Sequence, residues 1–368
     1  MKVLRIFLYN TGVHKKRVIE FTDNNGNFKN FICLAGVNGT GKTTLFDLIE
    51  NLGRFLNRKV QLNDFSINIE RENVLSLVDF VQIDFLIDNK IISVVIGDEK
   101  YIQNDNTKEQ MFIIENNVKE IIRKFEDDLK SQTEEKNISM IEKTRFEFYS
   151  REFAKRAKRL KKTKNNKSFF PVLQEISNNI DKNLIQNQTN LPFIYYFSDN
   201  DKKIIDTRYK ILPKYELRYD IVHKYSPSQD DLKGLLVYFD YAFNDKYLQL
   251  VEWINKNIFE DKEILQIDRP NFNVLIKTNT GDTHNIDYLS SGEKSILVIL
   301  VNIFLFANEQ SIILIDEIEK SLHPQFQEKL LNLIKKLQKE RGFQVIISAH
   351  SRKIWEDLQE DEIIDLTK

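Results

Sequence analysis

Eight consecutive residues near the start of the chain have the types and spacing needed to bind a chain of phosphates. They read Gly-Val-Asn-Gly-Thr-Gly-Lys-Thr, from Gly36 to Thr43, and match G-x-x-x-x-G-K-[ST] at every fixed position. Backbone N–H groups can converge on phosphate oxygens only where side chains do not block them, which is why glycine recurs. We expect Lys42 to reach the β- and γ-phosphates and Thr43 to ligate Mg²⁺. The phosphate-binding candidates are Gly36, Asn38, Gly39, Thr40, Gly41, Lys42, Thr43 and Thr44.

A second candidate lies where an apolar run, Ile312 to Ile315, ends in Asp316 and Glu317. Ligands of open α/β sheets bind beyond the carboxyl ends of the strands. Asp316 is therefore well placed to hold Mg²⁺, and Glu317 to orient and deprotonate an attacking water. Taken alone, the pair fits a solvated acidic turn at least as well.

Two more stretches have weaker signals. Ser290, Ser291, Gly292 and Glu293 precede an apolar helix and predict either an anion site at its N-terminus or an ordinary helix cap. His350 ends the apolar run Val345 to Ala349 and is a candidate donor to a γ-phosphate oxygen, although a single histidine in such a place is more often structural.

The elements that must position these residues can be read from periodicity. Phe31 to Ala35 predicts a buried strand leading into the glycine cluster, and Thr43 to Leu56 a helix leaving it. Short strands are expected over Lys2 to Leu34. Two more are expected within Val74 to Ile102, joined at Asp88-Asn89.

The middle of the chain is mostly helical in pattern. Apolar spacing predicts helices from Glu109 to Leu129, from Ile138 to Leu160, and one or two over Leu232 to Phe259. Phe193 to Phe197 predicts a buried strand, and Ile264 to Ile286 a return to strands with a turn at Thr280-Gly281-Asp282. We therefore expect an α/β core in two parts, residues 1–104 and 262–368, with a mainly helical lobe inserted over residues 105–261.

Composition limits the classes of protein. The 368 residues carry 54 Lys and Arg against 55 Asp and Glu, so net charge predicts no partner. The single cysteine, Cys33, excludes an internal disulfide framework. We find no apolar stretch of the roughly 20 residues that a membrane span needs and no signal peptide, so we expect a cytoplasmic protein without a membrane partner.

The order of the motifs is more specific than any one of them. It resembles that of ATP-binding-cassette (ABC) ATPases, in the soluble branch with RecF, Rad50 and SMC heads, and most closely the AAA15/AAA21-type, OLD-like ATPases. In this comparison Gly36–Thr43 match the Walker A motif, Ser290–Glu293 the signature motif, and Asp316 with Glu317 the Walker B motif and its catalytic glutamate. Glu319–Leu322 match the D-loop, and His350 the H-loop histidine. The implied fold is an ABC head, which combines a P-loop parallel core sheet with an antiparallel β subdomain.

Two features of that family have no clear counterpart. A Q-loop glutamine is not assigned, because Gln82 lies in a predicted strand, Gln103 follows one, and the turn after Phe197 has none. Phe21 and Tyr9 are the candidates for stacking on adenine.

The resemblance implies Mg²⁺-dependent ATP hydrolysis by two copies docked head to tail. Lys42, Glu317 and His350 would be catalytic, and Thr43 and Asp316 would hold the metal. Ser291 and Gly292 would act on nucleotide held by the partner copy.

The role in the cell is less constrained. Heads of this branch often serve in defence against phage or in DNA maintenance, and we favour defence. Only 18 residues follow His350, too few for a C-terminal nuclease, so we expect a separate effector protein. The alternatives are a RecF/Rad50-type repair ATPase, an ATP-dependent scaffold and, less favoured, a transporter subunit.

A basic segment from Arg151 to Lys167 could contact DNA or RNA. It has nine basic residues and one acidic residue. A solvated helix face or an acidic protein partner explains the same charge.

Overall fold

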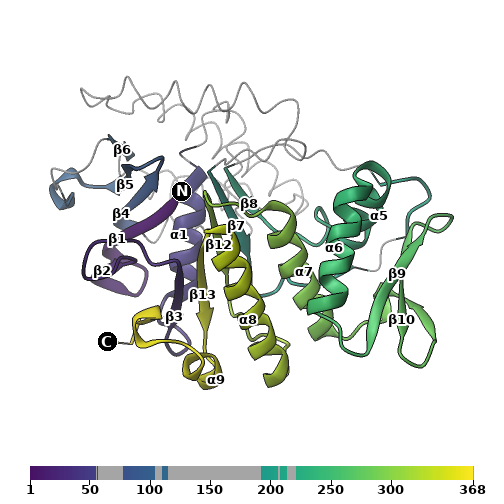
Figure 1. Ribbon diagram of the computed structural model, residues 1–368. Coiled ribbons are helices and arrows are strands. Elements are labelled where there is room, and N and C mark those ends of the chain that lie inside the picture. The colour runs from purple at the N-terminus through teal and green to yellow at the C-terminus, as the bar shows by residue number, and fades with distance from the viewer. Residues whose placement is uncertain are drawn as a thin grey trace, which may run out of the picture.

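The computed structural model consists of two main sheets around a shared core, with helices on both sides of the larger sheet (Figure 1). It describes residues 1–54, 56, 78–103, 110–114, 192–205, 208–213 and 221–367. The α/β architecture expected from the sequence is confirmed.

The larger sheet is parallel and has the strand order β14-β3-β13-β12-β7-β8. These strands are β3 (Phe31–Ala35), β7 (Phe193–Phe197), β8 (Val222–Lys224), β12 (Ser311–Ile315), β13 (Gln344–Ala349) and β14 (Ile363–Asp365). The four central strands are apolar along almost their whole length because both faces are covered.

Alternate residues of these strands join two different cores. On one face Ile312, Leu314 and Ile346 pack with α1 (Lys42–Arg54). On the other face Ile313, Ile315 and Val345 pack with α7 (Ser291–Phe306) and α8 (Pro324–Arg341). The period of two along a strand thus makes one sheet the centre of a helix–sheet–helix sandwich. The helix expected over Thr43 to Leu56 is confirmed as α1.

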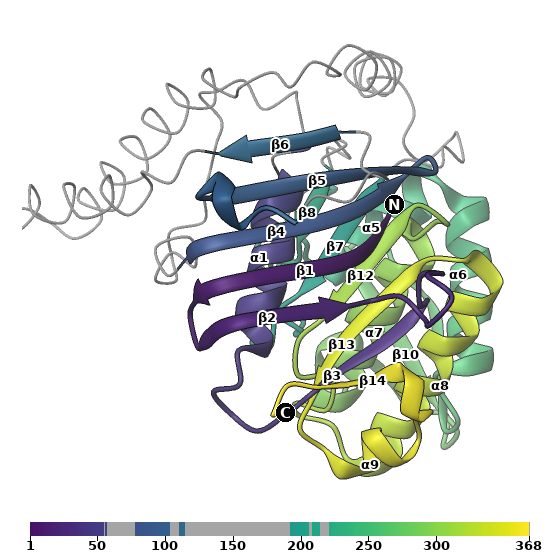
Figure 2. The ribbon, with the colours of Figure 1, turned by 90° about the vertical axis from the view of Figure 1, so that its left-hand side faces the viewer.

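The second sheet is five-stranded, in the order β2-β1-β4-β5-β6, and lies over the α1 side of the molecule (Figure 2). It contains β1 (Lys2–Thr11), β2 (His14–Glu20), β4 (Val78–Ile87), β5 (Lys90–Gly97) and β6 (Gln110–Ile114). The expected turn at Asp88-Asn89 joins β4 to β5, and both residues have positive φ, 48° and 61°. That is the backbone of a tight hairpin whose twist matches its strands.

A third, three-stranded sheet and two helices complete the described chain. α5 (Leu232–Ala242) and α6 (Asn244–Asn257) pack against β9 (Lys262–Asp268) and β10 (Asn273–Thr278), with β11 (Thr283–Asn285) outside β10. The helices expected over Leu232 to Phe259 and the strands expected over Ile264 to Ile286 are confirmed. The remaining elements are α9 (Arg352–Glu356) and the 3₁₀ turns Glu99–Tyr101, Ile286–Tyr288 and Glu360–Glu362.

Two expectations for the middle of the chain need correction. Gln110–Ile114, expected as the first turn of a helix, is a strand that pairs in parallel with β5, because a short apolar run suits either element and its place beside β5 decides between them. β7 and β8 belong to the large parallel sheet. The limits 105–261 are therefore too wide for an inserted lobe. The rest of the predicted helical region, residues 115–191 with the basic segment Arg151–Lys167, lies outside the described residues.

Candidate functional site

The Walker A loop connects β3 to α1 at the carboxyl end of the parallel sheet. Gly39 and Gly41 have φ of 83° and 87°, a conformation that other residues adopt only with strain. A Cβ on Gly36 would come 2.6 Å from the Thr40 hydroxyl, and one on Gly41 would come 2.4 Å from Nε2 of His14. Because only glycine fits these positions, the loop keeps the bare backbone that a phosphate needs.

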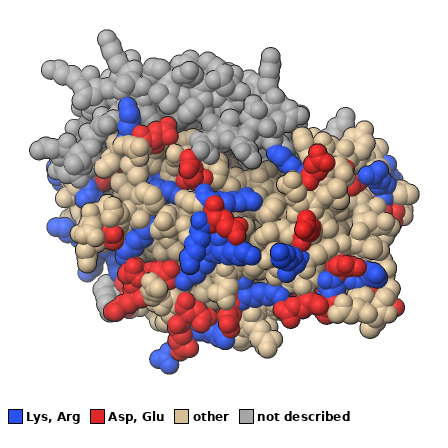
Figure 3. All heavy atoms as spheres, viewed as in Figure 1, with Lys and Arg blue, Asp and Glu red and all other residues tan. Residues whose placement is uncertain are grey.

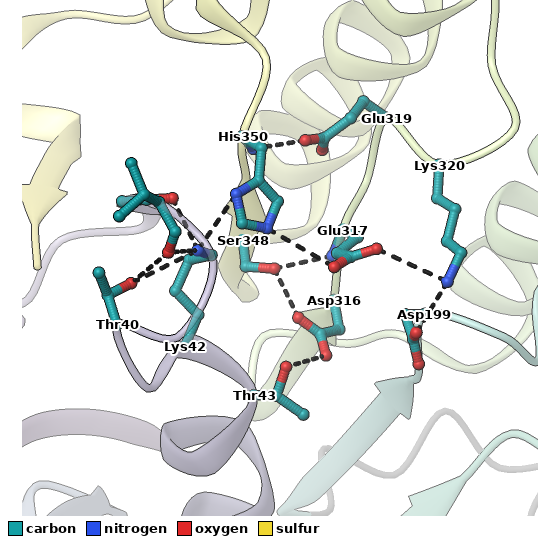
Figure 4. Close-up of polar contacts among 12 residues, drawn as sticks. Thr40, Lys42, Thr43, Asp199, Asp316, Glu317, Glu319, Lys320, Ser348 and His350 are labelled. Carbon is teal, nitrogen blue, oxygen red and sulfur yellow. Dashed lines mark hydrogen bonds and ion pairs between the residues drawn. The ribbon is translucent and has the colours of Figure 1, made fainter. Parts of the chain in front are cut away.

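Lys42 begins α1 and points back into this loop (Figure 4). Its Nζ donates to the carbonyls of Gly36, at 2.7 Å, and Val37, at 3.0 Å, and lies 3.4 Å from Nδ1 of His350. Burial lowers the pKa of Lys42, while Asp316, Glu317 and Glu319 oppose that effect. The ammonium group therefore sits among acceptors at the place where phosphate oxygens would be received.

Thr43 and Asp316 meet at the same edge of the sheet. The Thr43 hydroxyl donates to Oδ2 of Asp316 at 2.8 Å, and Ser348 donates to Oδ1 of Asp316 at 2.6 Å. Hydroxyl and carboxylate oxygens are ligands that Mg²⁺ prefers, and Mg²⁺ usually keeps several waters and substrate phosphates in its shell. Within the described residues no group of three or more His, Cys, Asp and Glu side chains could hold a metal by itself. The oxygen pair thus fits a Mg²⁺ ion that is shared with phosphate.

Glu317 follows Asp316 with a φ of 47°, in the left-handed region that strains a side-chain-bearing residue. Its N–H donates to Oγ of Ser348 at 2.7 Å, which secures this turn to β13. One carboxylate oxygen lies 3.5 Å from Nε2 of His350 and the other 3.6 Å from Nζ of Lys320. About a third of the Glu317 side chain is exposed, so a water molecule can reach it.

The structure brings together Lys42, Thr43, Asp316, Glu317 and His350, which are far apart in the sequence (Figure 4). Strand order explains this, because β13, which His350 directly follows, lies between the strand of the Walker A loop and the strand that leads to Asp316. Two of the other Walker A candidates, Asn38 and Thr44, lie away from this cluster. Asn38 is exposed, and Thr44 faces Gly12 in the β1–β2 turn.

The signature residues lie at a different place, the N-terminus of α7. Ser290 caps the helix by accepting from the Glu293 N–H, and the Glu293 carboxylate accepts from the Ser290 N–H. The structure therefore realises the ordinary cap that the sequence also allowed. Ser291 remains exposed, and Gly292 packs against Leu322 of the D-loop, where a Cβ would lie 3.4 Å from Cδ2 of Leu322.

Four side chains near Glu317 were missed in the sequence. Ser348 lies two residues before His350, so the period of a strand could have placed it on the same face. Asp199 and Lys202 gave no signal, because their partners are distant in the sequence, and Lys320 lies in the stretch that matches the D-loop but was predicted no role of its own. Lys320 pairs with Asp199 at 2.8 Å, and Lys202 donates to the carbonyls of Asp316 and Glu317.

The residues considered for the Q-loop and for adenine stacking have other contacts. Gln82 donates to Asp84 in β4 and accepts from the backbone N–H of Gln103, so this pair is engaged at the five-stranded sheet. Phe21 is fully buried and cannot stack on a ligand. Tyr9 stacks on Tyr101 with ring centroids 4.2 Å apart.

Comparison with known protein families shows which family the chain belongs to. Residues 31–354 match the family model described as "AAA domain, putative AbiEii toxin, Type IV TA system". The chain belongs to this family of ATP-binding ATPases. The AAA21 resemblance inferred from the motifs is therefore confirmed.

A curated relative aligns with part of the chain. Septu protein PtuA of Bacillus thuringiensis is 32% identical over 108 residues, which is 26% of this chain and 26% of that protein. Thus the alignment spans about a quarter of the length of this curated relative.

Two solved structures align with nearly the whole chain at low similarity. The SMC head domain from Thermotoga maritima has a TM-score of 0.43 at 11% identity, covering 98% of this chain and 93% of that one. An Smc head with an extended coiled coil, bound to the C-terminal domain of ScpA and derived from Pyrococcus furiosus, has a TM-score of 0.40 at 14% identity, covering 99% and 95%. The fold assignment rests on the strand order described above. Among the described residues, no helix is both long and apolar enough to span a bilayer.

Proposed function

We propose that this chain binds ATP with Mg²⁺ and hydrolyses it to ADP and phosphate. The contacts from Lys42 through His350 to Glu317, beside the Thr43–Asp316 pair, support this most strongly. Phosphoryl transfer to water requires a cation that binds phosphate, oxygen ligands for a metal, and a carboxylate that water can reach.

Each residue has a role that follows from its contacts. Bound Mg²⁺ would neutralise charge that develops on the terminal phosphate, and Thr43 and Asp316 would hold it. Lys42 would exchange its bonds to the Gly36 and Val37 carbonyls for bonds to phosphate oxygens. The Glu317 carboxylate would take the proton of the attacking water. His350, between Lys42 and Glu317, would donate to an oxygen of the γ-phosphate.

We further propose that two copies dock head to tail, with Ser291 and Gly292 of each acting on nucleotide held by the other. The exposure of Ser291 at the N-terminus of α7 supports this, because it leaves that site available to a second molecule. Nucleotide bound between two copies favours the closed dimer, and loss of the γ-phosphate releases it.

Phosphate release with and without Mg²⁺ tests the activity. Wild-type protein should release phosphate only with Mg²⁺, and Lys42→Ala and Glu317→Gln should lose at least about tenfold in kcat. Glu356→Gln, an exposed carboxylate on α9, is the control and should match wild type. Mg²⁺-independent release, or a Lys42→Ala rate equal to wild type, would contradict the proposal.

Light scattering tests the dimer. Glu317→Gln protein with Mg²⁺ and ATP should keep its nucleotide and run as a dimer, while nucleotide-free protein should run as a monomer. If Glu317→Gln protein with Mg²⁺ and ATP stays monomeric and holds no nucleotide, the two-copy arrangement is wrong.

For the cellular role we propose anti-phage defence together with a separate effector protein. The partial match to Septu protein PtuA favours this over DNA maintenance. On the described surface shown in Figure 3, basic and acidic side chains are interspersed, so that face offers no broad basic area for nucleic acid. A contact of Arg151–Lys167 with DNA or RNA would be tested by binding at increasing salt. Absence of binding at low salt removes that contact from the proposal.

A further inference from the structure

The turn after β7, residues 198–203, contacts Glu317 from the side away from the Walker A loop. Lys202, the fifth residue of this turn, is only 5% exposed. The Lys202 Nζ donates to the main-chain carbonyls of Asp316 and, at 3.0 Å, of Glu317. The Asp316 carbonyl belongs to the peptide bond between the proposed metal ligand and the proposed base, and the Glu317 carbonyl belongs to the next peptide bond.

Burial of a charged ammonium group at this position costs solvation free energy that an apolar side chain would not lose. Burial lowers the pKa of Lys202 to about 8, although Asp316 and Asp199 act in the opposite direction. The hydrogen bonds of Lys202 offset this cost by holding Glu317 at a φ of 47°, a strained backbone conformation that needs contacts around it to persist. Lys202 donates to the Glu317 carbonyl, and Ser348 accepts from the Glu317 N–H. The backbone of Glu317 is therefore held from both ends.

The same turn also reaches the Glu317 side chain. Asp199 and Asn200 accept from Nζ of Lys320 at 2.8 and 2.9 Å, and this Nζ lies 3.6 Å from the Glu317 carboxylate. One short segment therefore contacts both the backbone and, through Lys320, the side chain of the proposed base.

A further hydrogen bond joins this turn to the signature helix. Ser295, 5% exposed in α7, donates its hydroxyl to the main-chain carbonyl of Lys202 at 2.7 Å. Ser295 is four residues after Ser291, so the two lie on one face of α7, one turn apart. A displacement of the α7 N-terminus would thus reach Lys202 through a single hydrogen bond.

We propose that Lys202 is a positioning residue for Glu317, and that Ser295 couples Lys202 to the signature end of α7. In a docked dimer, contact of Ser291 with the partner's nucleotide would then adjust the base of its own subunit. This inference deepens the proposed ATPase function and rests on it for its kinetic part.

Lys202→Met removes both carbonyl contacts, and Lys203→Met, which changes the exposed neighbour, is the matched control. We expect Lys202→Met to lower kcat at least about tenfold while the affinity for a fluorescent ATP analogue changes less than about threefold. Lys202→Arg, which keeps a charged donor, should recover part of kcat. A kcat for Lys202→Met equal to that of Lys203→Met would overturn the positioning role.

Hydrogen exchange of the nucleotide-free protein gives a readout independent of turnover. The amides of residues 316–322 should exchange faster in Lys202→Met than in wild type or Lys203→Met, with the amides of α8 unchanged. Equal exchange in all three would also overturn the proposal. If wild type shows no ATPase activity but Lys202→Met still loosens residues 316–322, the ATPase function fails and the positioning role stands.

Ser295→Ala tests the coupling with little risk to folding. It should leave ATP affinity and the exchange of residues 316–322 close to wild type but lower kcat at least about threefold. A kcat equal to wild type would remove Ser295 from the proposal.

Discussion

Thr43 and Asp316, which are 273 residues apart in the chain, meet through a hydrogen bond of 2.8 Å between hydroxyl and carboxylate. This contact joins the first turn of α1 to the end of β12 across the intervening strand β13. It places two oxygen ligands side by side at the carboxyl edge of the sheet, where the Walker A loop also opens.

The Thr43–Asp316 pair leads to a prediction about metal dependence. Thr43→Val and Asp316→Asn each remove one oxygen ligand, so the Mg²⁺ concentration for half-maximal ATPase activity should rise at least about tenfold. A magnesium titration at saturating ATP measures this. An unchanged midpoint in both variants would mean that the pair does not hold the metal.

His350 lies between Lys42 and Glu317, with 3.4 Å from its Nδ1 to the lysine and 3.5 Å from its Nε2 to the carboxylate. His350→Ala should reduce kcat by about 10²-fold with little change in ATP affinity, because the lost contact is with the transferred phosphate. Steady-state kinetics and direct ATP binding separate the two. His323→Ala, at the start of α8, is the control and should match wild type.

Gly41 and Gly281 have nearly equal φ, 87° and 91°, but different surroundings. A Cβ on Gly41 would meet His14, whereas one on Gly281 meets nothing within 4 Å. Gly281→Ala should cost only about 1 kcal/mol of unfolding free energy from backbone strain. Gly41→Ala should in addition abolish ATP binding, measured by calorimetry. Normal binding by Gly41→Ala would contradict the phosphate cradle.

The head-to-tail arrangement predicts complementation between two inactive variants. Lys42→Ala lacks the phosphate lysine, and Ser291→Arg blocks the exposed start of α7. Each alone should be inactive, but a mixed dimer contains one intact site, so a 1:1 mixture should recover about a quarter of wild-type activity. A mixture as inactive as its components would argue against a site shared between copies.

Lys2 predicts a pH dependence of stability. Burial lowers its pKa from 10.5 to about 8 in the folded protein, where it donates to the carbonyl of Gly342. Between these pH values the unfolded chain binds more protons, so unfolding free energy rises with pH, and this contribution is lost as pH falls through about 8. Relative to Lys2→Met, wild type should gain about 1–3 kcal/mol from pH 8 to 10.5. Denaturant unfolding at each pH measures this difference. Parallel pH profiles of the unfolding free energy for wild type and Lys2→Met would contradict the prediction.

The sequence by itself determined the local parts of this protein. The Walker A loop, the apolar strands β3, β12 and β13, and the helix after the loop are visible because their signals are contiguous: glycine spacing, apolar runs and helical periodicity. Asp316 and His350 could be singled out for the same reason, since each stands directly at the end of an apolar run.

Tertiary structure decided which of these residues meet and what supports them. Lys202 and Asp199 reach Glu317 and its neighbour Lys320 from a segment more than a hundred residues earlier, and only the pairing of β7 with β12 brings the two segments together. Gln110–Ile114 has an apolar pattern that suits a helix or a strand, and its place beside β5 made it a strand. Periodicity records which face of an element is apolar, whereas the partner of that face is chosen by packing over the whole chain.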